Sequence, residues 1–157
     1  MTNTVQVHRV YIKATPERIW DAITKPEWTE KYGYTGLADY DLKVGGKHRT
    51  RPTQGFIDAG FTSDLVDGEV LEVDPPRKLV QSMTALWSDD VKAEGTSRVT
   101  WEIEPVGDSC RLVVTHDQMR DGANDELYGG WPMILSGLKT WLETGEVLTT
   151  PGSLMYT

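Results

Sequence analysis

The sequence predicts an α+β fold in which a curved antiparallel sheet wraps around a long C-terminal helix. Two observations lead to this fold class. Apolar and polar residues alternate with period two through the middle of the chain, and the longest pattern with helical spacing lies near its end. The 157 residues, 38% hydrophobic and 25% charged, have the size and balance of one ordinary domain. We therefore expect a single domain over residues 1–157.

A strand and two short helices are expected first. Residues 5–12 alternate as a half-buried strand does. Thr15 is a suitable N-cap and Pro16 fits the first helical position, which predicts a helix beginning there. A second short helix is expected over residues 26–32, because Pro26 can start it and Gly33 can end it.

Six more strands and one long helix follow. Glycine-, proline- and aspartate-rich turns separate the predicted strands, which cover residues 37–42, 47–52, 68–73, 78–87, 97–105 and 110–119. Residues 53–66 leave two alternatives open, a short edge strand or a flexible lid. The terminal helix, over residues 130–145, has an apolar stripe that the sheet must bury: Trp131, Ile134, Leu135, Leu138, Trp141 and Leu142.

The alternation also assigns faces to the last two strands. Trp101 shares a face with apolar neighbours and is expected to point inward, while Glu102 and Glu104 point outward. His116 has the parity of inward apolar residues. It is either a core histidine bonded to a neighbour or a polar anchor inside a ligand pocket.

Charge and residue counts exclude several classes of function. Sixteen Lys and Arg against 24 Asp and Glu give a net charge of −8, which opposes nucleic-acid binding. No apolar run has the length of a membrane span, and none has the features of a signal peptide. Three separated histidines and the lone Cys110 predict neither a metal site nor a disulfide. We expect a cytoplasmic protein without a cofactor.

Large aromatic residues and methionines are unusually frequent for this length. Six Trp, six Tyr and five Met stand against two Phe. They either fill a core or line a cavity between sheet and helix. The predicted cavity is lined by Met83, Trp87, Trp101, His116, Met119, Trp131, Leu135 and Leu138, with Trp28 and Tyr32 at its mouth.

Three stretches of sequence resemble the START-like (SRPBCC) superfamily. They are ATPERIWDAIT at residues 14–24, GEVLEVDPPRKLV at 68–80 and GGWP at 129–132. The second stretch resembles the branch similar to the C-terminal domain of the activator of heat-shock protein 90 ATPase. This resemblance implies a helix-grip fold with a hydrophobic cavity, but it implies no particular reaction.

Three functions are compatible with these observations. The first is binding of a small hydrophobic or aromatic ligand in the cavity. The second is a co-chaperone-like protein that stimulates a heat-shock ATPase, and the third is a cyclase- or hydrolase-type enzyme that uses His116 and pocket tyrosines. The expected partners are a small apolar ligand and, in the second case, a chaperone, with the protein a monomer or weak dimer and with neither nucleic acid nor membrane bound.

Overall fold

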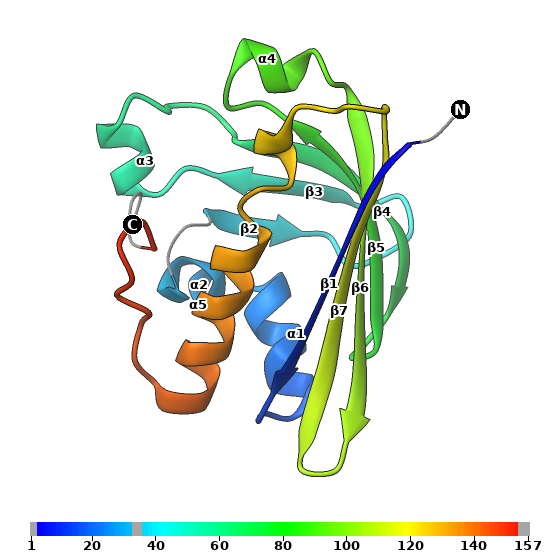
Figure 1. Cartoon of the computed structure of the whole chain (residues 1–157), viewed down its shortest axis with the longest axis vertical. Coiled ribbons are helices and arrows are strands. Elements are labelled where there is room, and N and C mark those ends of the chain that lie inside the picture. Colours follow the sequence, from blue (N-terminus) through cyan, green and yellow to red (C-terminus); the bar gives the residue numbers. More distant parts are fainter. Residues whose placement is uncertain (1–2, 33–35, 154–157) are drawn as a thin grey trace.

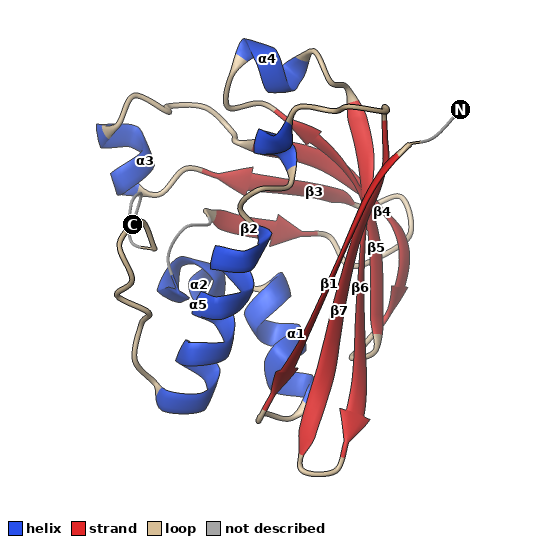
Figure 2. Cartoon of the chain, viewed as in Figure 1, coloured by secondary structure: helices blue, strands red, loops and turns tan. Residues whose placement is uncertain are grey.

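The computed structural model describes residues 3–32 and 36–153, which form a seven-stranded antiparallel sheet and the helices packed on it (Figures 1 and 2). Neighbouring strands follow the order β1-β7-β6-β5-β4-β3-β2. The strands are β1 (Thr4–Ile12), β2 (Leu37–Tyr40), β3 (Lys47–Arg51), β4 (Val66–Asp74), β5 (Lys78–Ala85), β6 (Thr96–Val106) and β7 (Ser109–Met119). The helices are α1 (Pro16–Thr24), α2 (Pro26–Thr29), η1 (Glu30–Tyr32), α3 (Gln54–Asp58), α4 (Asp89–Lys92), η2 (Asp125–Leu127) and α5 (Trp131–Thr144).

The predicted α+β helix-grip fold is confirmed. The curved sheet wraps around α5, and α1 and α2 follow the first strand as expected (Figure 1). The second helix differs in detail, because its last turn tightens into the 3-10 helix η1. Gly33, expected to end it, lies outside the described residues.

Residues 53–66 do not form the edge strand that was one of the two expected alternatives. The side-chain oxygen of Thr53 accepts a hydrogen bond from the backbone N–H of Phe56 at 3.4 Å and caps the short helix α3. A loop then leads to β4, which begins at Val66. The edge-strand alternative is therefore wrong, and this segment places apolar side chains over the open end of the sheet.

The first helix forms for the reasons read from the sequence. The hydroxyl of Thr15 accepts a hydrogen bond from the backbone N–H of Arg18 at 3.2 Å, and Pro16 occupies the first turn. Ile19 and Ile23 are buried on the opposite side of the helix and join the core.

The register of β6 places Trp101 on the inner face. Trp101 pairs with Leu79 on β5 and Val114 on β7, and only 7% of its surface is exposed. The neighbouring Glu102 and Glu104 are exposed. The predicted inward tryptophan and outward glutamates are confirmed.

A β-bulge near the end of β7 changes which residues face the core. Thr4 pairs with Met119 and Gln6 with His116, so β7 holds one more residue than β1 over this interval. Gln118, with φ of 60°, adopts the left-handed conformation there. As a result His116 and Met119 are both buried although they are three residues apart.

The terminal helix α5 packs unusually close to η1. A Cβ atom added to Gly137 would lie 2.7 Å from the backbone carbonyl oxygen of Tyr32. Leu138, in the next position, is fully buried, and Gly145 in the left-handed conformation ends the helix. A residue without a side chain therefore sets the distance between these two helices.

Two side chains of α5 also bind the backbone of the edge strand β1 and the residue after it. The ammonium of Lys139 donates to the carbonyl oxygen of Tyr11 at 2.7 Å, and the carboxylate of Glu143 accepts from the backbone N–H of Lys13 at 2.8 Å. Lys139 and Glu143 form an ion pair at 2.6 Å with each other. These bonds hold the last part of the edge strand against the helix.

Replacing Gly137 with Ala should destabilise the protein by about 1–3 kcal/mol, because the added methyl group meets backbone rather than a movable side chain. Chemical denaturation measures this change. The matched control is Ser136→Ala, an exposed position on the same helix, where the better helix former should leave stability unchanged or slightly higher. Equal stability of the two variants would contradict the close packing.

Candidate functional site

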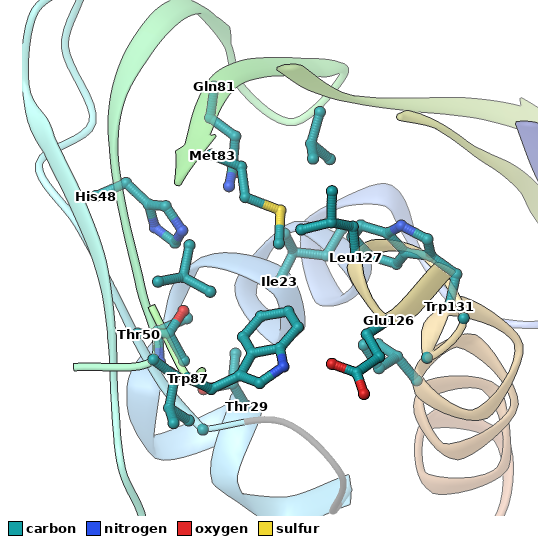
Figure 3. A pocket seen from close by; sticks show the side chains of 18 of the residues that line it. Ile23, Thr29, His48, Thr50, Gln81, Met83, Trp87, Glu126, Leu127 and Trp131 are labelled. Atoms are coloured by element: carbon teal, nitrogen blue, oxygen red, sulfur yellow. Dashed lines mark hydrogen bonds between the residues drawn. The ribbon is translucent and has the colours of Figure 1, made fainter. Parts of the chain in front are cut away.

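A cavity of about 680 Å³ lies between the open half of the sheet and the start of α5. Figure 3 shows Met83, Trp87 and Trp131 around the hollow, with His48 and Thr50 on one wall and Glu126 and Leu127 opposite. Its walls come from β2 to β6, from the segment of α3, and from the two loops that precede α4 and α5. The lining residues are Ile23, Thr29, Tyr32, Gly36, Ala38, Tyr40, His48, Thr50, Phe56, Phe61, Leu65, Val66, Gln81, Met83, Trp87, Ser88, Val99, Trp101, Asp125, Glu126, Leu127, Gly129, Gly130, Trp131 and Ile134.

The structure brings together half of the residues expected around the cavity. Met83, Trp87, Trp101 and Trp131 line it, as does Tyr32 from the expected mouth. The other expected residues lie elsewhere. His116, Met119, Leu135 and Leu138 are buried in the closed part of the core, and Trp28 packs edge-on against Trp141, with ring centroids 5.4 Å apart.

Several lining residues were not anticipated from the sequence. His48 and Thr50 lie on the inner face of β3, where both are buried. Both phenylalanines of the chain, Phe56 and Phe61, line the cavity from the segment that follows β3. A signal for His48 was present, since the three cations Lys47, Arg49 and Arg51 occupy alternate positions and leave the residues between them for the other face.

His116 is held by two hydrogen bonds inside the core. Its Nδ1 accepts from the indole Nε1–H of Trp131 at 3.2 Å, because an indole nitrogen can only donate. A neutral imidazole then carries its proton on Nε2, which donates to the hydroxyl of Ser97 at 2.8 Å. Ser97 in turn donates to the backbone carbonyl of Met83 at 3.3 Å. His116 therefore joins three elements of the fold.

This arrangement is the wrong tautomer for activating a serine. A histidine that removes the proton of a neighbouring hydroxyl needs a free lone pair on the nitrogen that faces it. In His116 the nitrogen facing Ser97 carries the proton. Burial also lowers the pKa of His116 to about 4, so the neutral form persists at neutral pH. The pair can position Trp131, but this geometry does not make Ser97 a nucleophile.

Tyr40, His48 and Gln81 form a polar cluster at the opposite end of the cavity. The rings of Tyr40 and His48 stack with centroids 4.2 Å apart, and the Tyr40 hydroxyl donates to Oε1 of Gln81 at 2.5 Å. Nδ1 of His48 is buried and has no hydrogen-bond partner among the described residues. Burial lowers the pKa of His48 to about 4, opposed by a hydrogen bond with the backbone of Asp39.

A second buried polar atom without a partner belongs to Trp101. Its Nε1 has no acceptor within the described part of the chain, while its ring meets that of Trp131 edge-on at 5.3 Å. Buried polar atoms are normally paired, so an orphan beside a cavity marks a place where a bound molecule or water completes the hydrogen bonding.

The cavity rim is acidic. Asp125 and Glu126 are the charged side chains that line the cavity within residues 3–32 and 36–153. The cations of β3 point to the outer face, where Lys47 pairs with Asp67 at 3.8 Å and Arg51 forms a two-pronged bond with Asp39. The cavity therefore offers aromatic surface and neutral polar groups inside, and negative charge at its edge.

One ion-pair cluster ties together the two loops at the rim. The carboxylate of Glu94, after α4, accepts from Arg120 at 2.6 and 2.7 Å and from the backbone N–H of Asn124 at 3.0 Å. Arg120 and Asn124 precede η2, which supplies the acidic rim. The connection between β5 and β6, which carries Trp87 before α4 and Glu94 after it, is thus linked to the segment that leads into η2.

Over residues 3–32 and 36–153, no group of three or more His, Cys, Asp or Glu side chains is arranged to hold a metal ion. No helix in the same ranges is long and apolar enough to cross a bilayer.

A curved antiparallel sheet gripping a C-terminal helix, with a cavity between them, defines a START-like (SRPBCC) protein. The chain belongs to the family described as activator of Hsp90 ATPase homolog 1-like proteins, which it matches over residues 13–143. A search of curated proteins finds no match.

Solved structures of similar fold come from several organisms. CalU16 from Micromonospora echinospora has a TM-score of 0.69 at 21% identity, over 91% of this chain and 78% of CalU16. The Aha1 dimer from Colwellia psychrerythraea has a TM-score of 0.68 at 20% identity, over 90% and 98%. An HSP90 activator from Plasmodium falciparum has a TM-score of 0.67 at 23% identity, over 88% and 95%. At these identities the likeness shows the fold.

The two buried histidines predict that acid destabilises the protein. Their pKa values of about 4 in the folded protein lie below the ordinary 6.5, so the unfolded chain binds these protons more readily. The free energy of unfolding should fall as the pH drops from about 6.5 to 4, by roughly 3 kcal/mol for each histidine.

Denaturant unfolding across this pH range measures the effect. The variant His116→Gln keeps a hydrogen-bond donor and an acceptor but does not titrate. About half of the loss of unfolding free energy between pH 6.5 and 4 should disappear in this variant, and the part due to His48 should remain as an internal reference. An unchanged pH dependence in this variant would contradict the assignment to His116.

Proposed function

We propose that the protein binds a small hydrophobic or aromatic ligand in the cavity between the sheet and α5. The observation that carries this proposal is the cavity of about 680 Å³, lined mainly by aromatic and aliphatic side chains with a few polar groups. Ligand pockets usually have volumes of about 300–1,000 Å³ and this kind of lining. Trp87, Trp101 and Trp131 would offer their ring faces and edges to an aromatic ligand.

The size of the cavity favours a ligand with more than one ring. A single aromatic group buries about 150–250 Å². At about 25 cal/mol per Å², this burial contributes ~4–6 kcal/mol before the cost of association. Because millimolar binding already requires about 4 kcal/mol, one ring alone would be held weakly. Two or more rings would use the volume and contribute enough for micromolar binding.

Stimulation of a heat-shock ATPase is the second candidate function. Family membership and the structural likeness to an HSP90 activator favour it. In this case a chaperone would be the partner, and the measurement is the ATPase rate of Hsp90 with and without the protein. One structure of similar fold is a dimer. We therefore propose that this protein is a monomer or a weak dimer, and analytical ultracentrifugation distinguishes the two states. For both functions we propose a cytoplasmic location.

An enzyme of the cyclase or hydrolase type is less well supported by the described residues. A catalytic role for His116 would require its side chain to lie in the cavity. The side chain is instead buried behind Trp131, and both of its ring nitrogens are hydrogen-bonded. Turnover of a cavity ligand would instead have to use polar groups that line the cavity, such as Tyr40, His48 and Gln81 or the carboxylates of Asp125 and Glu126.

Binding can be measured with the uncharged, environment-sensitive dye Nile red. Its fluorescence should rise on titration with the wild-type protein and fall when flavonoids or polyketide-like aromatics compete. Val66→Phe, which adds a ring inside the cavity, should weaken binding about tenfold or more, because the added side chain takes the space of the ligand.

The matched control is Val106→Phe, the same substitution at an exposed position on β6. It should bind the dye as the wild type does. Equal affinity in the two variants would place the dye outside the cavity, and no binding to the wild type would remove the ligand-binding proposal in favour of the chaperone function.

A further inference from the structure

The polar cluster of Tyr40, His48 and Gln81 specifies a ligand more narrowly than the size of the cavity does. All three side chains line the cavity, and His48 and Gln81 are only 3% and 4% exposed. They come from three strands, β2, β3 and β5, so the fold rather than a flexible loop sets their positions. The rest of this inference rests on the proposed binding function.

The cluster keeps both hydrogen-bond donors and hydrogen-bond acceptors available for a ligand. Tyr40 uses its only proton in the bond to Oε1 of Gln81, so its oxygen keeps lone pairs. The amide Nε2 of Gln81 has no hydrogen-bond partner among the described residues, and Figure 3 shows this nitrogen pointing into the cavity.

His48 supplies an acceptor. Its imidazole donates its proton to the backbone of Asp39, and Nδ1 is the nitrogen without a partner. In the neutral ring this Nδ1 carries a lone pair and accepts a hydrogen bond. Burial keeps the ring neutral by lowering its pKa, so the lone pair persists at neutral pH.

We propose that the natural ligand is an uncharged aromatic molecule bearing a hydroxyl group, bound with that hydroxyl at Tyr40, His48 and Gln81. A hydroxyl both donates and accepts hydrogen bonds at a single atom, as this cluster requires. It can donate to His48 or Tyr40 and accept from Gln81, while the rings lie against Met83 and the tryptophans.

The same arrangement disfavours a carboxylate. A carboxylate only accepts, so it would face the lone pairs of Tyr40 and His48 without a proton between them. The described cavity lining holds no Lys or Arg to offset its charge, and Asp125 and Glu126 at the rim repel it. Fatty acids are therefore excluded as ligands of this cavity, although their chains would suit its apolar walls.

A matched series of probes tests this specificity on the wild-type protein. Biphenyl, 4-methoxybiphenyl, 4-hydroxybiphenyl and biphenyl-4-carboxylate share one skeleton and compete with Nile red near neutral pH. The hydroxyl compound should bind about three- to tenfold tighter than the methoxy compound, which cannot donate. The carboxylate should bind more weakly than biphenyl itself.

Variants locate the effect in the cluster. His48→Phe keeps a ring to stack on Tyr40 but loses the acceptor, and Gln81→Met keeps the length but loses the amide. Each should lose the preference for the hydroxyl compound over the methoxy compound, measured as the ratio of the two affinities within the same variant. His48→Asn should restore part of the preference, and Gln6→Met, on the far edge strand β1, should change nothing.

The outcomes separate this inference from the proposed function. If biphenyl and the dye bind but the hydroxyl compound has no advantage, or the carboxylate binds as well, the inference is wrong and ligand binding stands. If no probe binds, both are wrong. Because the wild-type series needs no substitution, the inference can fail even where a variant does not fold.

Discussion

The hydrogen bond from the indole of Trp131 to His116 joins the first turn of α5 to the inner face of β7. Trp101 meets the same indole edge-on from β6. These three large side chains fill the space between the helix and this part of the sheet, so the core is closed on the side of β1, β7 and β6. The side of β2 to β5 has no helix of comparable length against it, and there the cavity remains. The position of Trp131 thus divides core from cavity.

Much of the fold could be predicted because it follows from periodic burial. The alternation around Trp101 fixes the inner face of β6, and the stripe that includes Leu135 and Leu138 identifies the helix that the sheet surrounds. These patterns report only that a side chain is buried. They do not tell whether it packs against protein or against a cavity. This is why Trp101, His116 and Leu138 were all expected at the cavity wall, although only Trp101 lines the cavity and the other two belong to the closed core.

The polar end of the site was missed for a different reason. The alternation of the cations leaves His48 for the other face of β3, but the pairing of Arg49 and Arg51 with aspartates is what identifies the face of the cations as the outer one. Those aspartates come from β2 and from the loop before β4, so the signal is spread over distant residues. Met119 was expected to face inward and it does, although alternation alone would give it the opposite face from His116; the bulge at Gln118 turns it inward.

The contacts of Lys139 and Glu143 with the backbone of Tyr11 and Lys13 also bear on the addition of strands at this edge of the sheet. An edge strand presents unpaired amide and carbonyl groups, a template on which another chain can add a strand. Here the ammonium of Lys139 donates to the carbonyl oxygen of Tyr11, and the carboxylate of Glu143 accepts from the backbone N–H of Lys13. A strand arriving from a neighbouring molecule would have to displace both, so growth of the sheet into a polymer is blocked at this corner by the helix that the sheet encloses.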